Sequence, residues 1–388
     1  MRVVVAPDKF KGSLTAAQVA ARVAAGLARA APGAEVLEMP VADGGDGTLE
    51  AAVEAGYRRV PVRAEGPTGE PVETAYAERD GVAVVELADV SGLGRLPGGR
   101  LAARTASSYG TGQVIRAALD AGCRRVVLGI GGSAGTDGGA GLVQALGGRL
   151  AGEHGGEVGR GGAALAAVRS LDLAGLHPAL ATAEVVVASD VDNPLLGPRG
   201  AAAVYGPQKG ASPAGVAELD AALARWADAV RRATGRDEAA TPGAGAAGGV
   251  GFAVLAVLGA TLASGIDLVL DLVGFRAVLP GAGLVITGEG SLDGQTLHGK
   301  APAGVAAAAR ASGIPVVAVA GRSLLSPSEL EPAGILAAYA LTDLEPDPGR
   351  CMAEAGPLLE RLAERVAADW MRDDSATTAN REEELADG

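Results

Sequence analysis

The chain has 388 residues, roughly two to three domains at ~150 residues each, and its 48% apolar and 20% charged residues exclude a disordered or fibrous protein. It has 60 glycines but few aromatic residues (2 Trp, 5 Tyr, 3 Phe), so its core must be packed from Val, Leu, Ile and Ala, as in layers of helices on a sheet. The net charge of -13 argues against a nucleic-acid partner, because neutralising phosphates requires a surplus of Lys and Arg.

Short β-branched runs alternate with alanine-rich helical patterns along the chain. Residues 2–6 (RVVVA) predict a buried strand, and apolar residues recur every four positions over 15–31, which predicts one face of a helix. Thr15 and Gln18 have the spacing of a capping box at the start of that helix. Four further strands are predicted, each directly before a glycine-rich or polar loop: 125–130, 184–188, 283–287 and 314–320. This alternation predicts an α/β fold with largely parallel strands.

Three segments depart from the alternation. Residues 60–87 mix Pro and Gly with alternating apolar residues, which predicts a hairpin-like antiparallel insertion. The most apolar stretch, 250–266, is short and glycine-rich for a membrane span and predicts a buried helix. The segment 372–388 carries six acidic residues against two arginines and no apolar face, so we expect a disordered acidic tail. With no signal peptide visible, we expect a cytoplasmic protein without membrane partners.

The loops after the predicted strands are the candidates for chemistry, because ligands of parallel sheets bind at the carboxyl ends of strands. The first strand is followed by Lys9, Lys11 and Ser13 directly before the capped helix, where free N–H groups and ammonium charges favour an anion. A second loop places Asp43 and Asp46 among three glycines, and such acids can hold Mg²⁺ or accept a proton from a substrate hydroxyl. A pair of surface lysines and an ordinary Asp–Gly turn remain the alternatives.

The loop 129–139 combines many glycines with hydroxyl side chains after a strand, which is typical of a phosphate-binding nest. Residues 129–134 also match a dinucleotide fingerprint, but the acid expected about twenty residues later would be Glu153, which no strand precedes. The segment 294–300 begins like a Walker A motif, yet Ala301 stands where a hydroxyl for Mg²⁺ is required. Neither nucleotide fingerprint is complete.

Two further loops gather acids. Asp190, Asp192 and Asn193 follow the strand 184–188 and offer oxygen ligands suited to Mg²⁺ that carries substrate phosphates, although solvated acids in a turn are the alternative. The loop after the strand 283–287 supplies two more acids and a lysine: Glu289, Asp293 and Lys300. Acids and lysines among glycines at four or more strand ends together indicate phosphoryl transfer.

Eight segments resemble, in chain order, the signature segments of bacterial glycerate kinases of the type-1 family: PDKFKGSLTA, PVADGGDGT, SSYGTGQVI, GIGGSAGTDGGAGL, ASDVDNPLLGPRGAA, YGPQKGA, PGAGAAGGVGF and ITGEGSLDGQTLHGKAPAGVA. The resemblance covers nearly the whole chain and implies ATP- and Mg²⁺-dependent phosphorylation of D-glycerate, with 2-phosphoglycerate favoured over 3-phosphoglycerate as the product. It also implies two α/β domains with the active site in the cleft between them. One is a flavodoxin-like parallel-sheet domain built from 1–90 and 280–371, and the other is inserted at 91–279.

We assign roles within this resemblance as follows. Asp190, Asp43 and Lys9 are expected to be catalytic, and Asp190, Asp192 and Asn193 are expected to hold Mg²⁺. Ten residues are expected to contact substrate or phosphate: Lys11, Ser13, Gly131, Gly132, Ser133, Asp137, Lys209, Glu289, Asp293 and Lys300.

The chain departs from the family pattern at two loop positions. Thr136 stands where many relatives have Asn, and Asp46 stands where many have Glu. Both substitutions keep a polar side chain, so they affect fine geometry rather than the reaction.

Two other function classes fit parts of the sequence. An NAD(P)-dependent oxidoreductase of small hydroxy acids would use residues 129–134, and the missing second-strand acid counts against it. A non-catalytic ligand-binding protein would have little need for so many carboxylates beside an anion. The oligomeric state is not indicated.

Overall fold

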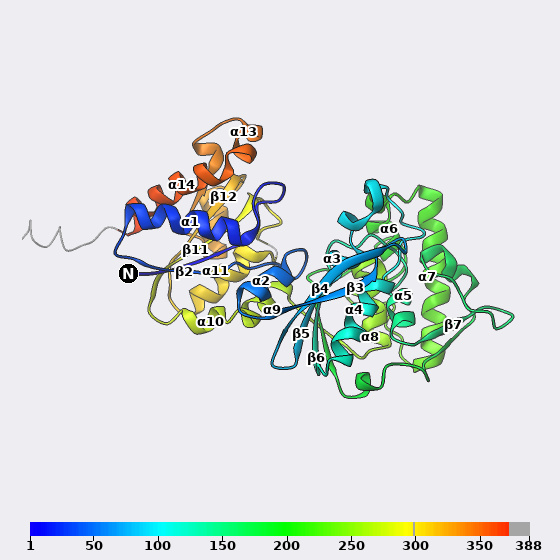
Figure 1. Ribbon diagram of the computed structural model, residues 1–388. Coiled ribbons are helices and arrows are strands. Elements are labelled where there is room, and N and C mark those ends of the chain that lie inside the picture. Colours follow the sequence, from blue (N-terminus) through cyan, green and yellow to red (C-terminus); the bar gives the residue numbers. More distant parts are fainter. Residues whose placement is uncertain (298, 372–388) are drawn as a thin grey trace, which may run out of the picture. The chain divides into compact units, whose positions relative to one another are not determined.

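The computed structural model describes residues 1–297 and 299–371, so the predicted acidic tail at 372–388 lies outside the described residues (Figure 1). The chain divides into two compact units. Unit 1 consists of Met1–Val41 and of the chain from Gly274 onward, and unit 2 is Ala42–Val273. Both units combine a sheet with helices, which confirms the predicted α/β class.

Unit 1 contains a five-stranded sheet in the order β13-β12-β11-β1-β2, with every neighbouring pair parallel. Its strands are β1 (Arg2–Pro7), β2 (Glu35–Glu38), β11 (Ala282–Leu292), β12 (Val316–Ser323) and β13 (Ala337–Ala340). Its helices are α1 (Ala16–Ala30), α10 (Phe275–Val278), α11 (Ala301–Ala311), α12 (Pro327–Leu330), α13 (Pro348–Ala353) and α14 (Ala355–Trp370). The β1 sequence is a continuous apolar run because helices cover both faces of this sheet.

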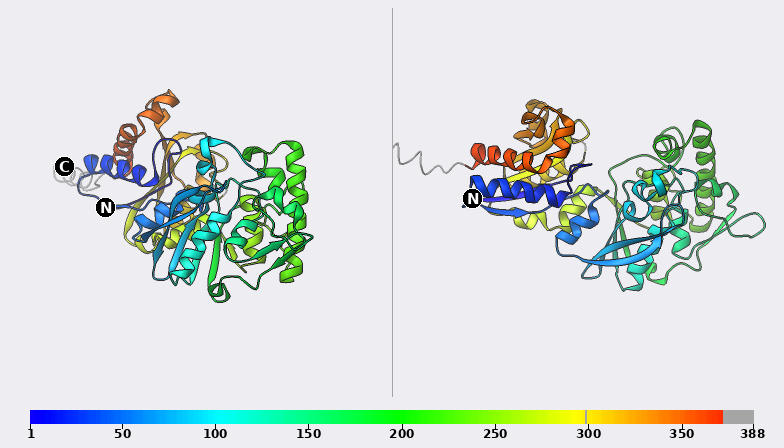
Figure 2. Two further views of the ribbon diagram at one scale, coloured as in Figure 1. Left: turned by 45° about the vertical axis from the view of Figure 1, so that its right-hand side comes forward. Right: turned by 45° about the horizontal axis from the view of Figure 1, so that its top comes forward.

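Helices α1 and α14 lie side by side along one face of the sheet of unit 1, and α11 lies on the other (Figure 1, Figure 2). Val19, Val23 and Leu27 form the buried stripe of α1 and pack with Val3 and Val5 of the sheet. The predicted capping box is confirmed, since Thr15 Oγ1 accepts from Gln18 N at 3.2 Å and Thr15 N donates to Gln18 Oε1 at 3.0 Å.

Unit 2 contains a six-stranded mixed sheet in the order β10-β9-β6-β5-β4-β3 and a two-stranded ribbon of β7 and β8. Its strands are β3 (Arg58–Glu65), β4 (Pro71–Arg79), β5 (Val82–Glu86), β6 (Arg125–Gly129), β7 (Arg149–Ala151), β8 (Ser170–Asp172), β9 (Glu184–Ala188) and β10 (Thr261–Ala263). Its helices are α2 (Thr48–Glu54), α3 (Leu87–Ser91), α4 (Tyr109–Asp120), α5 (Ala140–Ala145), α6 (Ala201–Tyr205), α7 (Pro213–Thr234), α8 (Ala246–Ala256) and α9 (Gly265–Leu272).

Alternate residues of the central strands of unit 2 point to two different cores. Val126 and Leu128 of β6 pack with residues of α4 and α8, whereas Val127 packs with Leu49 of α2 and Leu268 of α9. The sheet is therefore covered on both faces, and the carboxyl ends of β5, β6 and β9 meet at one edge because these strands are parallel.

The structure differs from the predicted organisation at two places. The first seam lies at 41/42 instead of near 90, because the predicted antiparallel strands β3, β4 and β5 continue the sheet of unit 2 through the parallel pairing of β5 with β6. The second seam lies at 273/274, close to the predicted 280. The apolar stretch 250–266 is not one helix: α8 ends at Ala256, and Gly259, with φ +66°, turns the chain into β10.

No helix in 1–297 or 299–371 has the length and apolar character that crossing a membrane requires.

Candidate active site

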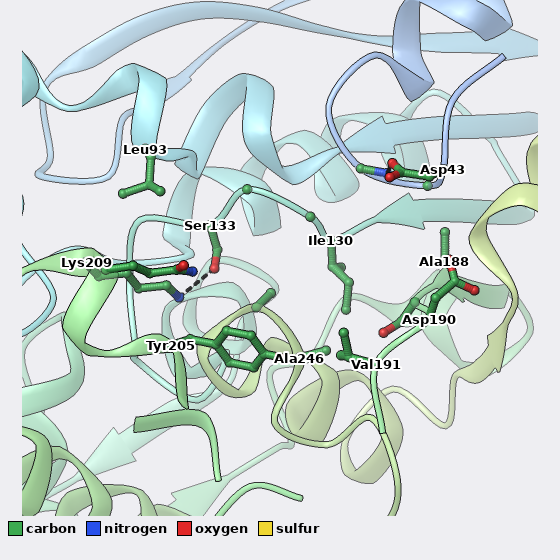
Figure 3. Close-up of a pocket in the computed structure, with 17 residues that line it drawn as sticks. Asp43, Leu93, Ile130, Ser133, Ala188, Asp190, Val191, Tyr205, Lys209 and Ala246 are labelled. Carbon is green, nitrogen blue, oxygen red and sulfur yellow. Dashed lines mark hydrogen bonds between the residues drawn. The ribbon is translucent and has the colours of Figure 1, made fainter. Parts of the chain in front are cut away.

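Unit 2 has a pocket of about 250 Å³ beyond the carboxyl ends of β6 and β9 (Figure 3). Loops far apart in the sequence form its wall, and they lie where ligands of parallel sheets bind, at the carboxyl ends of the strands. Six of the predicted site residues line it: Asp43, Gly131, Gly132, Ser133, Asp190 and Lys209. The structure thus brings into one cavity residues that the sequence offered only as separate loops.

Two carboxylates face this pocket from the same side. Figure 3 shows Asp43 and Asp190 near the Ala188 end, away from Lys209 and Ser133. The Asp190 carboxylate accepts hydrogen bonds from the Gly265 N–H at 3.0 and 3.2 Å. The residue as a whole is exposed at the pocket, yet the carboxyl is packed closely enough that burial raises its pKa, and the charge of Asp43 adds to this rise.

Lys209 lies at the other end of the pocket and is 1% exposed. Its Nζ donates to Ser133 Oγ at 2.7 Å and to the Gly135 carbonyl at 2.5 Å. Burial lowers the pKa of Lys209 to about 7, and the negative charge of Asp137 partly opposes this. Lys209 therefore holds the glycine-rich loop after β6 in place, in addition to facing the pocket.

Asp137 lies behind the pocket wall and not in its lining, which differs from its predicted role in contacting substrate. It is 1% exposed, and its Oδ2 accepts from Ser107 Oγ at 3.0 Å and from Ser108 N and Oγ at 2.8 and 3.0 Å. Its carboxylate also accepts from the backbone N–H groups of Gly139 and Gly141. Because these donors satisfy both oxygens, Asp137 ties the start of α4 to the loop before α5.

The residues predicted to hold Mg²⁺ do not converge. Asp192 is exposed and forms an ion pair with Arg199 at 3.0 Å. Asn193 Oδ1 accepts from the Tyr205 hydroxyl at 2.6 Å, and its Nδ2 donates to the Arg199 carbonyl at 2.8 Å. Of the three, only Asp190 faces the pocket. Across the described ranges no group of three His, Cys, Asp or Glu side chains is arranged to hold a metal ion, so the set does not fit a resident Mg²⁺.

Unit 1 carries its own charged cluster at the carboxyl ends of β1 and β11. These strands are parallel neighbours, which places Asp8 beside Glu289, and each residue is 8% exposed. Lys9 Nζ lies 3.7 Å from Asp8 Oδ1, and Lys300 Nζ lies 3.5 Å from Glu289 Oε2. Burial raises the pKa of Glu289, whereas the Thr296 hydroxyl and the Lys300 ammonium act in the opposite direction. Asp293 completes the cluster, 3.9 Å from Lys300.

The other two predicted residues of unit 1 lie on a tight turn before α1. Lys11 is exposed, and Ser13 Oγ donates to the Phe10 carbonyl at 3.1 Å. The Ser13 hydroxyl therefore has a local partner within the turn.

Sequence reasoning missed several residues of these sites. Tyr205 and Gln208 line the pocket of unit 2, although Lys209 was the one residue of their segment, YGPQKGA, that was predicted to contact substrate. Asp8 was passed over between a proline and two lysines. Asp8 could have been identified from the sequence, because it is a polar residue directly after a buried strand. No comparable sequence pattern identifies Tyr205 as a residue of the pocket.

The chain is similar to known proteins over nearly its whole length. The model of the glycerate kinase family matches residues 3–371. The chain is 43% identical over 371 residues to the glycerate kinase of Bacillus subtilis (strain 168), covering 95% of this chain and 97% of that protein. It is 44% identical over 325 residues to the glycerate 2-kinase of Escherichia coli (strain K12), covering 83% and 85%.

A solved structure is similar over the whole chain as well. The crystal structure of a protein assigned as glycerate kinase 2 from Salmonella typhimurium LT2 aligns with a TM-score of 0.84 at 41% identity, covering 98% of this chain and 99% of that chain. These similarities leave the oxidoreductase alternative without support.

Proposed function

The chain belongs to the glycerate kinase family and is a phosphotransferase with an alcohol group as acceptor, and from this premise we propose that it transfers the γ-phosphoryl group of ATP to the 2-hydroxyl of D-glycerate. The observation that carries the proposal is the pair of carboxylates, Asp43 and Asp190, that two distant loops present in one pocket. Phosphoryl transfer needs a group that accepts the hydroxyl proton and groups that hold the transferring phosphate, and little else from the protein.

We assign the proton-accepting role to Asp190. A carboxyl whose pKa is raised is a better proton acceptor than an ordinary aspartate, and the Gly265 N–H fixes its orientation. When the glycerate hydroxyl attacks the γ-phosphorus, its proton passes to an oxygen of Asp190.

We assign Asp43 to the Mg²⁺ that enters with ATP as part of the substrate. Mg²⁺ in such sites is held by one or two carboxylates together with substrate phosphates, and it neutralises charge on the phosphoryl oxygens. A pair of carboxylates without a complete protein ligand set is consistent with that arrangement.

The anionic groups of the substrates require donors and cations. In unit 2 the loop of Gly131, Gly132 and Ser133 offers backbone N–H groups at the pocket, and Lys209 holds this loop through Ser133. In unit 1 we assign Lys9 and Lys300 to carboxylate or phosphate groups, because both ammonium groups lie at the strand ends.

The experiment that tests the proposal is an incubation of the purified protein with D-glycerate, ATP and Mg²⁺. ADP and 2-phosphoglycerate are expected in equal amounts, and EDTA is expected to stop the reaction. Phosphorus NMR of the product separates 2- from 3-phosphoglycerate. ADP release that does not depend on glycerate, or reduction of NAD⁺ in its place, would contradict the proposal.

A further inference from the structure

A buried acid outside the pocket contacts the loop that carries Asp43. Glu86 is the last residue of β5 and is 5% exposed. Its Oε2 accepts hydrogen bonds from Gly47 N at 3.1 Å and from Leu49 N at 3.0 Å. Leu49 is the second residue of α2 and Gly47 is its N-cap residue, which has no side chain that could accept from the helix N-terminus. Glu86 therefore supplies, from a neighbouring strand, the cap that α2 lacks.

The segment held by Glu86 packs backbone to backbone against the pocket wall. A Cβ atom at Gly129 would lie 2.7 Å from the Gly44 carbonyl oxygen, and one at Gly131 would lie 2.7 Å from Gly45 Cα. No side chain fits between these two loops. A displacement of the segment 44–47 would therefore change the pocket wall directly.

The same segment determines where Asp43 lies. Asp43 Oδ1 accepts from Gly45 N at 3.2 Å, and the Gly45 carbonyl accepts from Thr48 Oγ1 at 2.7 Å. The Asp43 carboxylate is thus connected to the start of α2, where Glu86 is attached. We propose that Glu86 is a positioning residue that fixes the loop carrying Asp43 at the pocket; its effect on turnover rests on the proposed function.

The charges around Glu86 make an acid at this position unfavourable for stability. Asp46 and Asp89 both face it with negative charge, and Asp89 is paired with Arg95. Burial and these like charges raise the pKa of Glu86 to about 7, so the ionised carboxylate opposes stability at neutral pH. The two hydrogen bonds that Glu86 accepts from Gly47 N and Leu49 N offset part of this unfavourable contribution, and they hold the segment that follows Asp43.

The test combines steady-state kinetics with amide hydrogen exchange of the full chain, using Glu86→Ala, Glu86→Gln and the control Glu78→Ala. Glu78 belongs to the same sheet and accepts from Gly81 N at 3.3 Å, directly before β5, at the opposite end of that strand. For Glu86→Ala we expect faster amide hydrogen exchange in 42–52. We also expect kcat to fall by about 10- to 100-fold with KM little changed, because a displaced Asp43 carboxylate lowers the rate of the chemical step more than it weakens substrate binding. Glu86→Gln keeps an oxygen acceptor and is expected to restore both readouts, and Glu78→Ala is expected to change neither.

Three results would overturn the proposal: wild-type kcat in Glu86→Ala, wild-type exchange in 42–52, or an equal loss of kcat in Glu78→Ala. If Glu86→Ala does not fold, Glu86→Asp takes its place, because the shorter side chain cannot reach both N–H groups, and the same outcomes decide. If the wild-type protein itself fails to phosphorylate glycerate, the proposed function fails, and the exchange rates in 42–52 alone decide whether Glu86 positions the loop.

Discussion

Replacing Asp190 by Asn tests the proposed chemistry most directly. The substitution keeps the size of the side chain, and the amide oxygen can still accept from the Gly265 N–H, so the fold around α9 should be preserved. What is lost is the negative charge and the ability to take up the hydroxyl proton. A positioned base contributes about 10²- to 10⁴-fold, so we expect kcat to fall by at least about 100-fold, which is ~2.7 kcal/mol of transition-state stabilisation.

Asp192→Asn is the matched control, two residues along the chain. Asp192 is 75% exposed in its side chain and paired with Arg199, and a surface ion pair contributes about 0–1 kcal/mol. Its kcat should stay within about twofold of wild type, because no reacting group depends on it. The two variants therefore separate the pocket-facing acid from its neighbour in the predicted metal set.

The assay is ADP release coupled to D-glycerate consumption, with melting curves to confirm folding. Because the pKa of Asp190 is raised above the ordinary 3.8, the acidic limb of the wild-type kcat/KM profile should lie at higher pH than an ordinary aspartate would give. That limb should be absent from Asp190→Asn. Wild-type kcat in Asp190→Asn, or an equal loss in Asp192→Asn, would refute the assignment.

Three further predictions concern the buried charges and the lysines. Glu86 has a pKa of about 7 in the folded state against an ordinary 4.5, so the folded state binds its proton more tightly than the unfolded state does. As the pH rises from 4 to 8, the free energy of unfolding of wild type in urea should therefore fall by ~3 kcal/mol relative to that of Glu86→Gln. A difference that does not change with pH would disprove the raised pKa. Lys209 has a lowered pKa, so wild type should gain stability relative to Lys209→Met as pH rises from about 7 toward 10.5; a flat difference would show that the lysine is solvated. Lys9→Met should raise KM for ATP or glycerate and also lower kcat, because a contact to a ground-state anion is lost; unchanged KM values would remove Lys9 from the site.

The elements that could be predicted are those whose signals are local. The strand Arg2–Pro7 and the capping box of Thr15 and Gln18 depend on residues within one turn or one strand, and both were found where expected. The seam near 90 failed because the decisive contact, the pairing of β5 with β6, joins segments separated by α3 and α4. Nothing in the antiparallel pattern of 60–87 shows which sheet it extends.

The pocket residues likewise divide into those that local sequence could predict and those that depend on contacts between distant segments. The rule that ligands bind at the ends of parallel strands selected loops that share a pocket, since six predicted residues line it. The rule does not say which side chain within a loop turns inward. Asp192 and Asn193 are neighbours of Asp190 in sequence, yet Arg199 and Tyr205 hold them elsewhere.

The partner of Asp190 in the pocket comes instead from a loop in a distant part of the chain, Asp43. Its position depends on a third segment, through the bonds of Glu86 to the start of α2. A glutamate that ends the apolar run VAVVE is visible in the sequence, but its contacts appear only when β5 is placed beside the start of α2. The two acids of the pocket and Glu86 therefore come from three separate segments of the chain. If Glu86 positions the loop of Asp43 as we propose, Glu86→Ala should lower kcat, whereas Glu78→Ala, which removes a glutamate from the opposite end of β5, should not.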